Sequence, residues 1–184
     1  MKSFVSRVVL CLLLAFNSRT APAQTRLTVS QALDFWITLT EKSVVSAADA
    51  MPEEKYSFAP TTGEFTGVRT FAEQVKHLAA NNYRMAAYIV GQTPTSDQES
   101  ETGPDAVRSK AQVMDYVRGS FAALHRAVAT IDERNMLESM AIPLPRQKTR
   151  LQLAVDVVAH SNDHYGQMVE YLRMNGIVPP ESRR

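Results

Sequence analysis

Apolar residues recur with the spacing of an α-helix in four long stretches of the chain, at about 29–50, 70–90, from after Pro104 to about 131, and 149–175. Within each stretch they fall three or four positions apart, which places them on one face of a helix. Thr70 and Glu73 form a capping box at the start of the second stretch. No stretch alternates as a convincing β-strand would. The pattern therefore predicts an all-α domain, an up-down bundle of four long helices without a substantial sheet.

The segments between the predicted helices differ in character. Pro52 ends the first helix, and the loop after it carries Tyr56, Phe58 and Phe65. Aromatic side chains in a loop gain much by packing on the domain, so this loop is expected to be held against the helices. Residues 92–104 are polar and acidic, which predicts an exposed and mobile connection.

The first residues have the pattern of a secretory signal peptide. Lys2 and Arg7 precede an apolar run at 8–16, which is too short to span a bilayer, and a small-residue cleavage site follows at 21–23. We therefore predict a signal peptide at 1–23, a mature domain at 24–184, a periplasmic or secreted location, and no stable membrane insertion after cleavage. A signal anchor is the alternative, and it is disfavoured because no stop-transfer pattern follows.

Composition excludes several kinds of site. The single cysteine, Cys11, lies in the predicted signal peptide, so the mature chain has no disulfide, no zinc thiolate site and no cysteine nucleophile. Three of the 20 basic residues and none of the 19 acidic residues precede the cleavage site, so the mature chain is slightly acidic. It has no run of Lys and Arg, and nothing in the charge pattern indicates a nucleic acid or an anionic membrane as partner.

His160 and His164 are four positions apart in the last predicted helix, which stacks their imidazoles on one face about one turn apart. They lie toward one edge of a wide apolar arc, so the pair should face a neighbouring helix. Buried imidazoles need partners for their nitrogens, and one metal ion would satisfy both rings. The alternative is a hydrogen-bonded core pair with Gln, Asn or Tyr side chains as partners.

His77 lies away from the centre of the apolar face of the second predicted helix. Its stripe is polar and mostly uncharged, and consists of Thr70, Gln74, Asn81, Arg84 and Tyr88. A solvated face normally carries more Lys and Glu, so this stripe is typical of the lining of a polar pocket. The alternative is an ordinary surface histidine. His125, on the shoulder of the third predicted helix, is interpreted as a packing or surface histidine.

Three segments together resemble a known family, the DinB/YfiT-like four-helix bundle proteins, which are not the DNA polymerase that shares the name. Residues 58–84 contain a proline-bearing loop, an aromatic residue before the second helix, and that helix's histidine. Residues 159–180 contain the paired histidines and a helix that ends in glycine and prolines, and residues 46–58 also fit. The resemblance covers almost the whole mature chain.

The resemblance implies a divalent metal ion held by one histidine of the second helix and two of the last, here His77, His160 and His164. Three imidazoles leave positions open for water or substrate, as in catalytic rather than closed structural sites. Imidazole ligands suit Zn, Ni or Fe, so the identity of the metal is open. The second nitrogen of each ring should find a partner, with Asp156 or Asn81 nearest along the helices.

The implied function is that of a metal-dependent enzyme, a hydrolase or transferase acting on a small molecule. Several members of the family transfer groups involving low-molecular-weight thiols in the cytoplasm, whereas this chain is expected to be exported, which puts a thiol cosubstrate in doubt. The alternative is a non-catalytic bundle that binds a metal or a ligand. A polar opening lined by Gln74, Asn81 or Tyr88 would favour the enzyme, and an apolar seal would favour the binding module. Association as a homodimer is left open.

Overall fold

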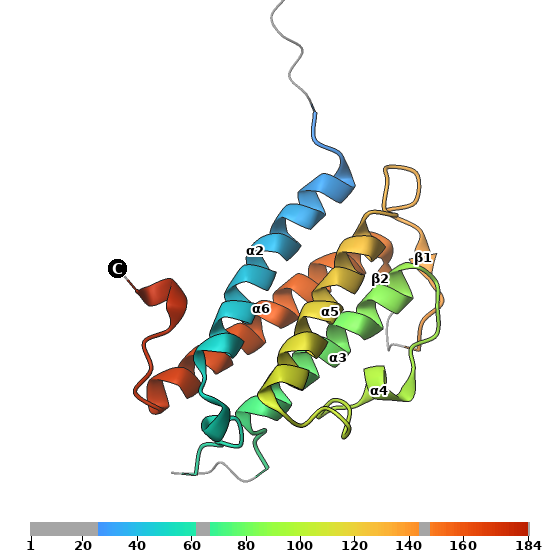
Figure 1. Ribbon diagram of the computed structural model, residues 1–184. Helices are drawn as coiled ribbons and strands as arrows, with labels where there is room; N and C mark the ends of the chain where they lie inside the picture. The colour runs from blue at the N-terminus through green and yellow to red at the C-terminus, as the bar shows by residue number, and fades with distance from the viewer. Residues whose placement is uncertain (1–25, 62–66, 144–147, 184) are drawn as a thin grey trace, which may run out of the picture.

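Four long helices form the body of the protein in the computed structural model, which describes residues 26–61, 67–143 and 148–183 (Figure 1). They are α2 (Val29–Ala50), α3 (Phe71–Ile89), α5 (Lys110–Val128) and α6 (Arg150–Met174). Shorter elements connect or follow them: the 3-10 helices η1 (Glu53–Lys55) and η2 (Pro180–Ser182), the one-turn helix α4 (Ser96–Glu99), and the strands β1 (Ser139–Met140) and β2 (Lys148–Thr149). The predicted all-α bundle is confirmed.

The two strands are a small departure from the expectation that the chain forms none. They pair antiparallel, with Ser139 opposite Thr149 and Met140 opposite Lys148. A pair of two-residue strands contributes little stability by itself. Its effect is to fix the approach to α6, because Thr149 is also the N-cap residue of that helix.

Each long helix begins at a capping box. Thr28, Thr70, Ser109 and Thr149 each accept a hydrogen bond from the main-chain N–H three residues on, where a Gln or Glu side chain bonds back. This exchange satisfies two of the amides that a helix start leaves unpaired. The third long helix, predicted to begin after Pro104 and to run to about 131, begins at Lys110 after its own cap and ends at Val128.

The helices do not alternate strictly in direction. The first turn of α5 lies at the end of α2, where Lys110 Nζ donates to the carbonyl oxygens of Asp49 and Met51. The start of α6 lies at the end of α3, where Arg150 donates to the carbonyl oxygen of Ile89. Helices α3 and α5 thus run parallel to each other and antiparallel to α2 and α6 (Figure 1). The predicted up-down order is broken at this one step.

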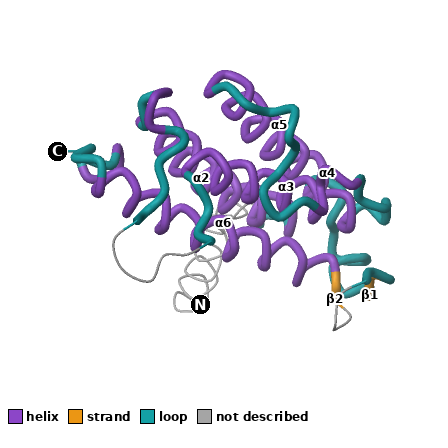
Figure 2. Tube along the Cα trace, turned by 90° about the horizontal axis from the view of Figure 1, so that it is seen from below, coloured by secondary structure: helices purple, strands orange, loops and turns teal. Residues whose placement is uncertain are grey.

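The chain achieves the parallel step by crossing back along α3. Residues 92–104, predicted to be an exposed connection, contain α4, which lies beside α3 (Figure 2). Gly103 and Pro104 are buried, and the side chain of Arg69 pairs with that of Glu101 at 2.7 Å. The prediction of an exposed loop is therefore wrong for the part of this segment that packs on α3.

The loop after α2 is held against the helices, as its aromatic residues predict. Tyr56 is buried and its hydroxyl donates to the carbonyl oxygen of Ala48 at 2.8 Å. The ring of Phe58 meets that of Tyr171 edge-on at 5.8 Å between centroids. Phe65 lies outside the described residues.

The core between the helices includes a buried polar bridge. Asn82 is fully buried, and its Nδ2 donates to Oγ of Ser120 at 3.2 Å, while its Oδ1 accepts from Oγ of Ser161 at 3.0 Å. A buried amide left without such partners would be strongly destabilising. The bridge therefore joins α3 to both α5 and α6 and fixes their relative position near the centre of the bundle.

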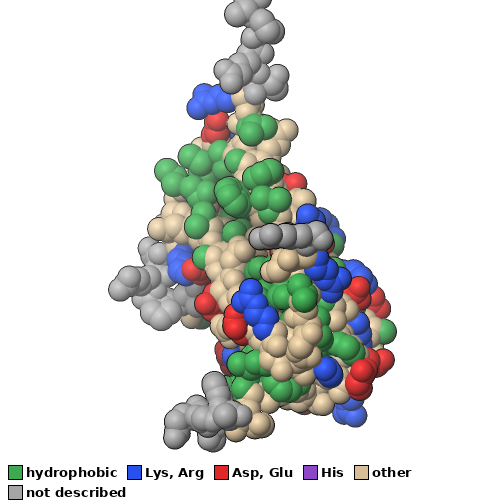
Figure 3. All heavy atoms as spheres, turned by 90° about the vertical axis from the view of Figure 1, so that its left-hand side faces the viewer, with side chains coloured by type: hydrophobic (Ala, Val, Ile, Leu, Met, Phe, Trp, Pro, Cys, Tyr) green, Lys and Arg blue, Asp and Glu red, His purple; other side chains and the backbone are tan. Residues whose placement is uncertain are grey.

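The beginning of α2 presents apolar side chains to solvent. Leu27, Phe35, Trp36 and Leu39 are all exposed, and Figure 3 shows apolar side chains gathered on this side of the molecule. The apolar spacing at 29–50 therefore predicts the helix correctly, although some of its apolar residues, such as Trp36, lie outside the core. The predicted signal peptide at 1–23 lies outside the described residues. Among the helices of the described ranges, none combines the length and the apolar composition that crossing a bilayer requires.

His125 is a packing histidine, as interpreted from the sequence. Its Nδ1 lies 2.5 Å from Asp34 Oδ1 and its Nε2 lies 3.0 Å from Glu41 Oε2, so it ties α5 to α2. Burial alone would lower the pKa of His125, but the hydrogen bonds to the two carboxylates and their negative charges raise it above the ordinary value.

We expect the substitution His125→Gln to destabilise the fold in a pH-dependent way. Because the pKa of His125 is higher in the folded state than in the unfolded state, its protonation stabilises the fold. This contribution is complete at pH values below the unfolded-state pKa, and it is lost as the pH rises through the folded-state pKa. Near pH 6 the free energy of unfolding of the parent should exceed that of the variant by about 1 kcal/mol. The difference is no larger because these ion pairs are partly exposed to solvent and screened. Urea unfolding over a pH series measures the difference. A difference in the free energy of unfolding that stays constant up to about pH 9 would contradict a stabilising ion pair between protonated His125 and the two carboxylates.

Candidate metal centre

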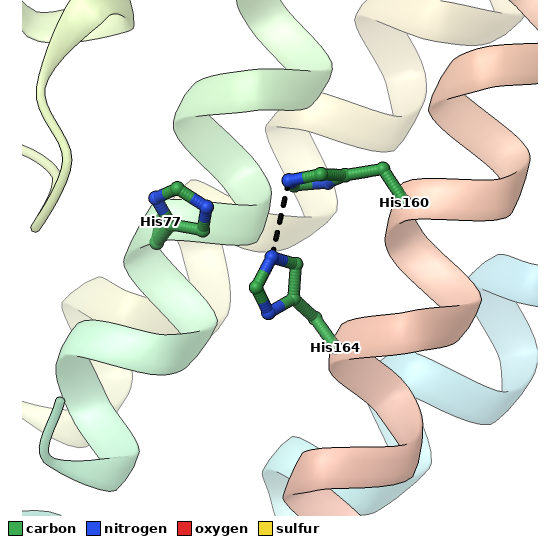
Figure 4. Close-up of side chains that lie close together, drawn as sticks. All are labelled: His77, His160 and His164. Carbon is green, nitrogen blue, oxygen red and sulfur yellow. Dashed lines mark hydrogen bonds between the residues drawn. The ribbon is translucent and has the colours of Figure 1, made fainter. Parts of the chain in front are cut away.

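The structure brings His77, His160 and His164 together between two antiparallel helices. His77 projects from α3, and the other two project from consecutive turns of α6 (Figure 4). One nitrogen from each ring lies within 4.8 Å of those of the others. The ring centroids are 4.3 to 5.3 Å apart. All three residues that the sequence singled out therefore face one small volume, and they could hold a metal ion.

The spacing of the paired histidines suits a shared ion. Nε2 of His164 and Nε2 of His160 are 3.0 Å apart. Two nitrogens at 2.0–2.1 Å from one zinc ion in tetrahedral geometry are about 3.3 Å apart. Small rotations of the two side chains, which move the nitrogens apart by a few tenths of an ångström, accommodate this difference. Among the described residues, these three histidines are the one group of His, Cys, Asp or Glu side chains close enough together to hold a metal ion.

The outward nitrogen of every ring is already engaged. Nδ1 of His77 lies 2.9 Å from the main-chain oxygen of Glu101. Nδ1 of His164 lies 2.6 Å from Nε2 of Gln74, and Nδ1 of His160 lies 3.1 Å from Nδ2 of Asn81. Because each Nδ1 faces a protein group, Nε2 is the nitrogen left to face the shared volume. In His77 the second nitrogen faces a carbonyl oxygen, which is the arrangement typical of metal-binding histidines.

Of the two partners suggested from the sequence, one contacts a histidine. Asn81 meets His160, whereas Asp156 pairs with Lys148 at 2.6 Å, so the suggestion of Asp156 is wrong. Lys148 lies in β2, eight residues before Asp156, and its ammonium group donates to the Asp156 carboxylate. Gln74 was predicted only as a pocket residue. The contact of Glu101 with His77 was not predicted from the sequence, because it is made by the main-chain oxygen of Glu101.

The partners differ in what they impose on each imidazole. A carbonyl oxygen can only accept, so the bond to Glu101 requires a proton on Nδ1 of His77 and leaves a lone pair on its Nε2. Asn81 turns its Nδ2 toward His160 because its Oδ1 accepts from Arg84, and Gln74 Nε2, which faces His164, also donates to Gln167 Oε1. Neither amide therefore requires a proton on Nδ1 of its histidine. His77 is the one of the three rings whose partner requires the proton on Nδ1 and leaves Nε2 free to accept.

The site favours neutral imidazoles. His77 and His164 are each 7% exposed, and His160 is half-buried. Burial, followed by the proximity of the other histidines, lowers the pKa of His160 and of His164 to about 4. Burial also lowers the pKa of His77, with Arg69 contributing in the same direction. Rings that are neutral near pH 7 need not lose a proton before binding a metal ion.

Polar rather than apolar groups surround the three rings. Gln74 and Asn81 are buried against them, and Gln74 also donates to Oε1 of Gln167 at 2.7 Å. Arg84 donates to Oδ1 of Asn81 at 2.7 Å and so holds a positive charge near the site. This shell differs from the apolar seal that would favour a non-catalytic binding module. Tyr88, which the sequence grouped with these residues, is also buried.

The fold and the site define a class of protein, a four-helix bundle with three histidines gathered from its second and fourth long helices. The chain belongs to the DinB superfamily, whose family model matches residues 37–168. Two solved structures have a similar fold. A DinB-like protein from Bacillus cereus has a TM-score of 0.67 at 17% identity and covers 83% of this chain and 96% of its own. A DinB-like protein from Bacillus subtilis has a TM-score of 0.63 at 16% identity, with coverages of 83% and 99%. No curated protein matches the sequence closely enough to count as a relative.

Proposed function

We propose that this protein is a metal-dependent enzyme, a hydrolase or transferase, that acts on a small molecule. In this proposal His77, His160 and His164 hold one divalent ion, zinc, nickel or iron. The observation that carries the proposal is that three ring nitrogens lie within 4.8 Å of one another while each Nδ1 is engaged by another group. Three protein ligands leave at least one position for water or substrate.

The protein's own residues would prepare this chemistry. A bound zinc ion lowers the pKa of its water to about 7 and so supplies a nucleophile or polarises a substrate oxygen. Gln74 and Asn81 orient the two rings of α6, and the carbonyl oxygen of Glu101 orients His77. Arg69 and Arg84 both lower the pKa of His77 through their positive charge, which favours an anionic group on the substrate.

A non-catalytic metal-binding bundle is the second candidate, and the polar shell of Gln74, Asn81 and Gln167 weighs against it. Export would separate this protein from the thiol transferases of its family, because an abundant thiol is a property of the cytoplasm. We therefore place hydrolysis of small esters, amides or phosphoesters ahead of thiol transfer.

The test combines metal loading with a substrate screen. Protein stripped with a chelator is reloaded with zinc, nickel or iron and assayed against chromogenic esters, amides and phosphoesters, and against electrophiles with added thiols. The proposal predicts turnover that depends on one of these metals, that disappears in the stripped protein, and that persists in the control His125→Gln. One equivalent of bound metal without turnover on any class of substrate would favour the binding module.

A further inference from the structure

Residues 100–104, which we call the crossing segment, are bound to α3 at several points. Arg69 Nε donates to the main-chain oxygen of Glu101 at 2.9 Å, and its guanidinium pairs with the Glu101 carboxylate. Lys76 Nζ donates to the main-chain oxygen of Pro104 at 3.0 Å, in a buried contact. Ser100 closes the segment on itself by donating to the main-chain oxygen of Gly103 at 3.0 Å. The crossing segment is therefore attached at one end to Arg69, two residues before α3, and at the other end to Lys76 in α3.

The same segment carries the group that fixes the tautomer of His77. The carbonyl oxygen of Glu101 has two lone pairs, and it accepts from both Arg69 and Nδ1 of His77. The Glu101 carboxylate lies farther from the ring, at 3.5 Å from Nδ1, and is 70% exposed. The short and directional contact is thus the one from the main chain, and it depends on where the backbone lies rather than on a side chain.

Gly103 sets how closely this backbone approaches α3. Its φ is +71°, a conformation that side chains disfavour. A Cβ atom at this position would lie 2.5 Å from Cβ of Lys76 and 3.1 Å from its main-chain carbon and oxygen. Lys76 directly precedes His77 on α3, and its main chain has no room to yield within a helix. A side chain at 103 would therefore lift the crossing segment from the helix that bears His77.

We propose that the crossing segment is a positioning element for the metal site. By docking through Gly103, it holds the Glu101 carbonyl against His77 and presets Nε2 of that ring as a metal ligand. The inference rests on the proposed metal site and adds a reciprocal coupling. A docked segment raises the affinity for metal, and bound metal must then stabilise the docked segment to the same extent.

The substitution Gly103→Ala tests this coupling, with Gly176→Ala as its matched control. Gly176 has a φ of +72°, and a Cβ there would have nothing within 4 Å, so the control carries the same backbone strain without the clash. We expect Gly103→Ala to weaken metal binding by about 10- to 100-fold, the range seen when a ligand loses its supporting partner. The control should keep the parent affinity, as measured by competition with a chromogenic chelator.

Two further readouts separate positioning from a loss of stability. Nitrogen NMR of the metal-free parent should show His77 protonated on Nδ1, and Gly103→Ala should shift it toward a mixture of tautomers. Hydrogen exchange in residues 100–104 should slow when metal is added to the parent and stay unchanged in the variant. Equal metal affinity in Gly103→Ala and Gly176→Ala would overturn the inference.

The variant Glu101→Ala separates the carbonyl from the carboxylate. It keeps the main-chain oxygen, so we expect it to bind metal nearly as tightly as the parent. A loss as large as that of Gly103→Ala would contradict positioning by the main chain. If the parent itself binds no metal, the proposed function fails, whereas the tautomer of His77 in metal-free protein still decides whether the crossing segment presets the ring.

Discussion

Replacing His160 with alanine should weaken binding of a divalent metal ion by more than about 100-fold and leave the bundle folded. His160 supplies one of the three ring nitrogens, and its Nε2 lies 3.0 Å from that of His164. The two rings that remain, on different helices, would have to hold the ion with one fewer protein ligand. Because His160 is only half-buried, its removal creates a small cavity at most.

Metal content after dialysis and calorimetric titration measure the loss, and the helical circular dichroism signal reports the fold. The matched control is His125→Ala, which removes a histidine of similar exposure that lies against Asp34 and Glu41. It should keep one equivalent of metal. Parent-like affinity in His160→Ala would show that the ion, if any, is bound elsewhere, and would remove the basis of the proposed function.

Removal of the Phe121 ring should produce the largest change in stability. Phe121 lies in α5, is 1% exposed and is among the largest fully buried side chains of the described residues. The substitution Phe121→Ala should lower the free energy of unfolding by about 3–5 kcal/mol, from lost burial and from the cavity left behind. Urea denaturation followed by circular dichroism measures this change.

The control for this prediction is Phe35→Ala, because Phe35 is 57% exposed on α2. It loses the same ring with little loss of burial, so its stability should change by less than about 1 kcal/mol. Similar losses for the two variants would mean that Phe35 is covered in solution, for example by a second copy of the chain. A small loss for Phe121→Ala would contradict the packing of α5 described above.

The local features of the fold could be read from the sequence because their causes are local. The capping box of Thr70 and Glu73 lies within four consecutive residues, and the structure contains both of its hydrogen bonds. The same holds for the spacing of His160 and His164, which are one turn apart in any helix. The antiparallel approach of α3 and α6, which carries His77 to the pair, is not local, because it depends on the parallel step from α3 to α5.

The contact between Glu101 and His77 could not be predicted in this way. It is made by a main-chain carbonyl, which every residue possesses, so the sequence contains no signal for it. Its position depends on the crossing between α3 and α5, and the polar composition of 92–104 indicated solvent instead. Gly103 was the available clue, since a glycine in a positive-φ conformation often marks a close approach of two backbones.

The placement of the three histidines on α3 and α6 also determines when the site can exist. Gln74 and its contact His164 are 90 residues apart, and α6 is the last of the four long helices to leave the ribosome. Domains generally fold as units, so the three histidines come together only when α6 packs against α3. In the proposed metal site, an ion would therefore meet all three rings only after this packing. For a chain that is exported before it folds, the ion would be selected by the metals available outside the cytoplasm.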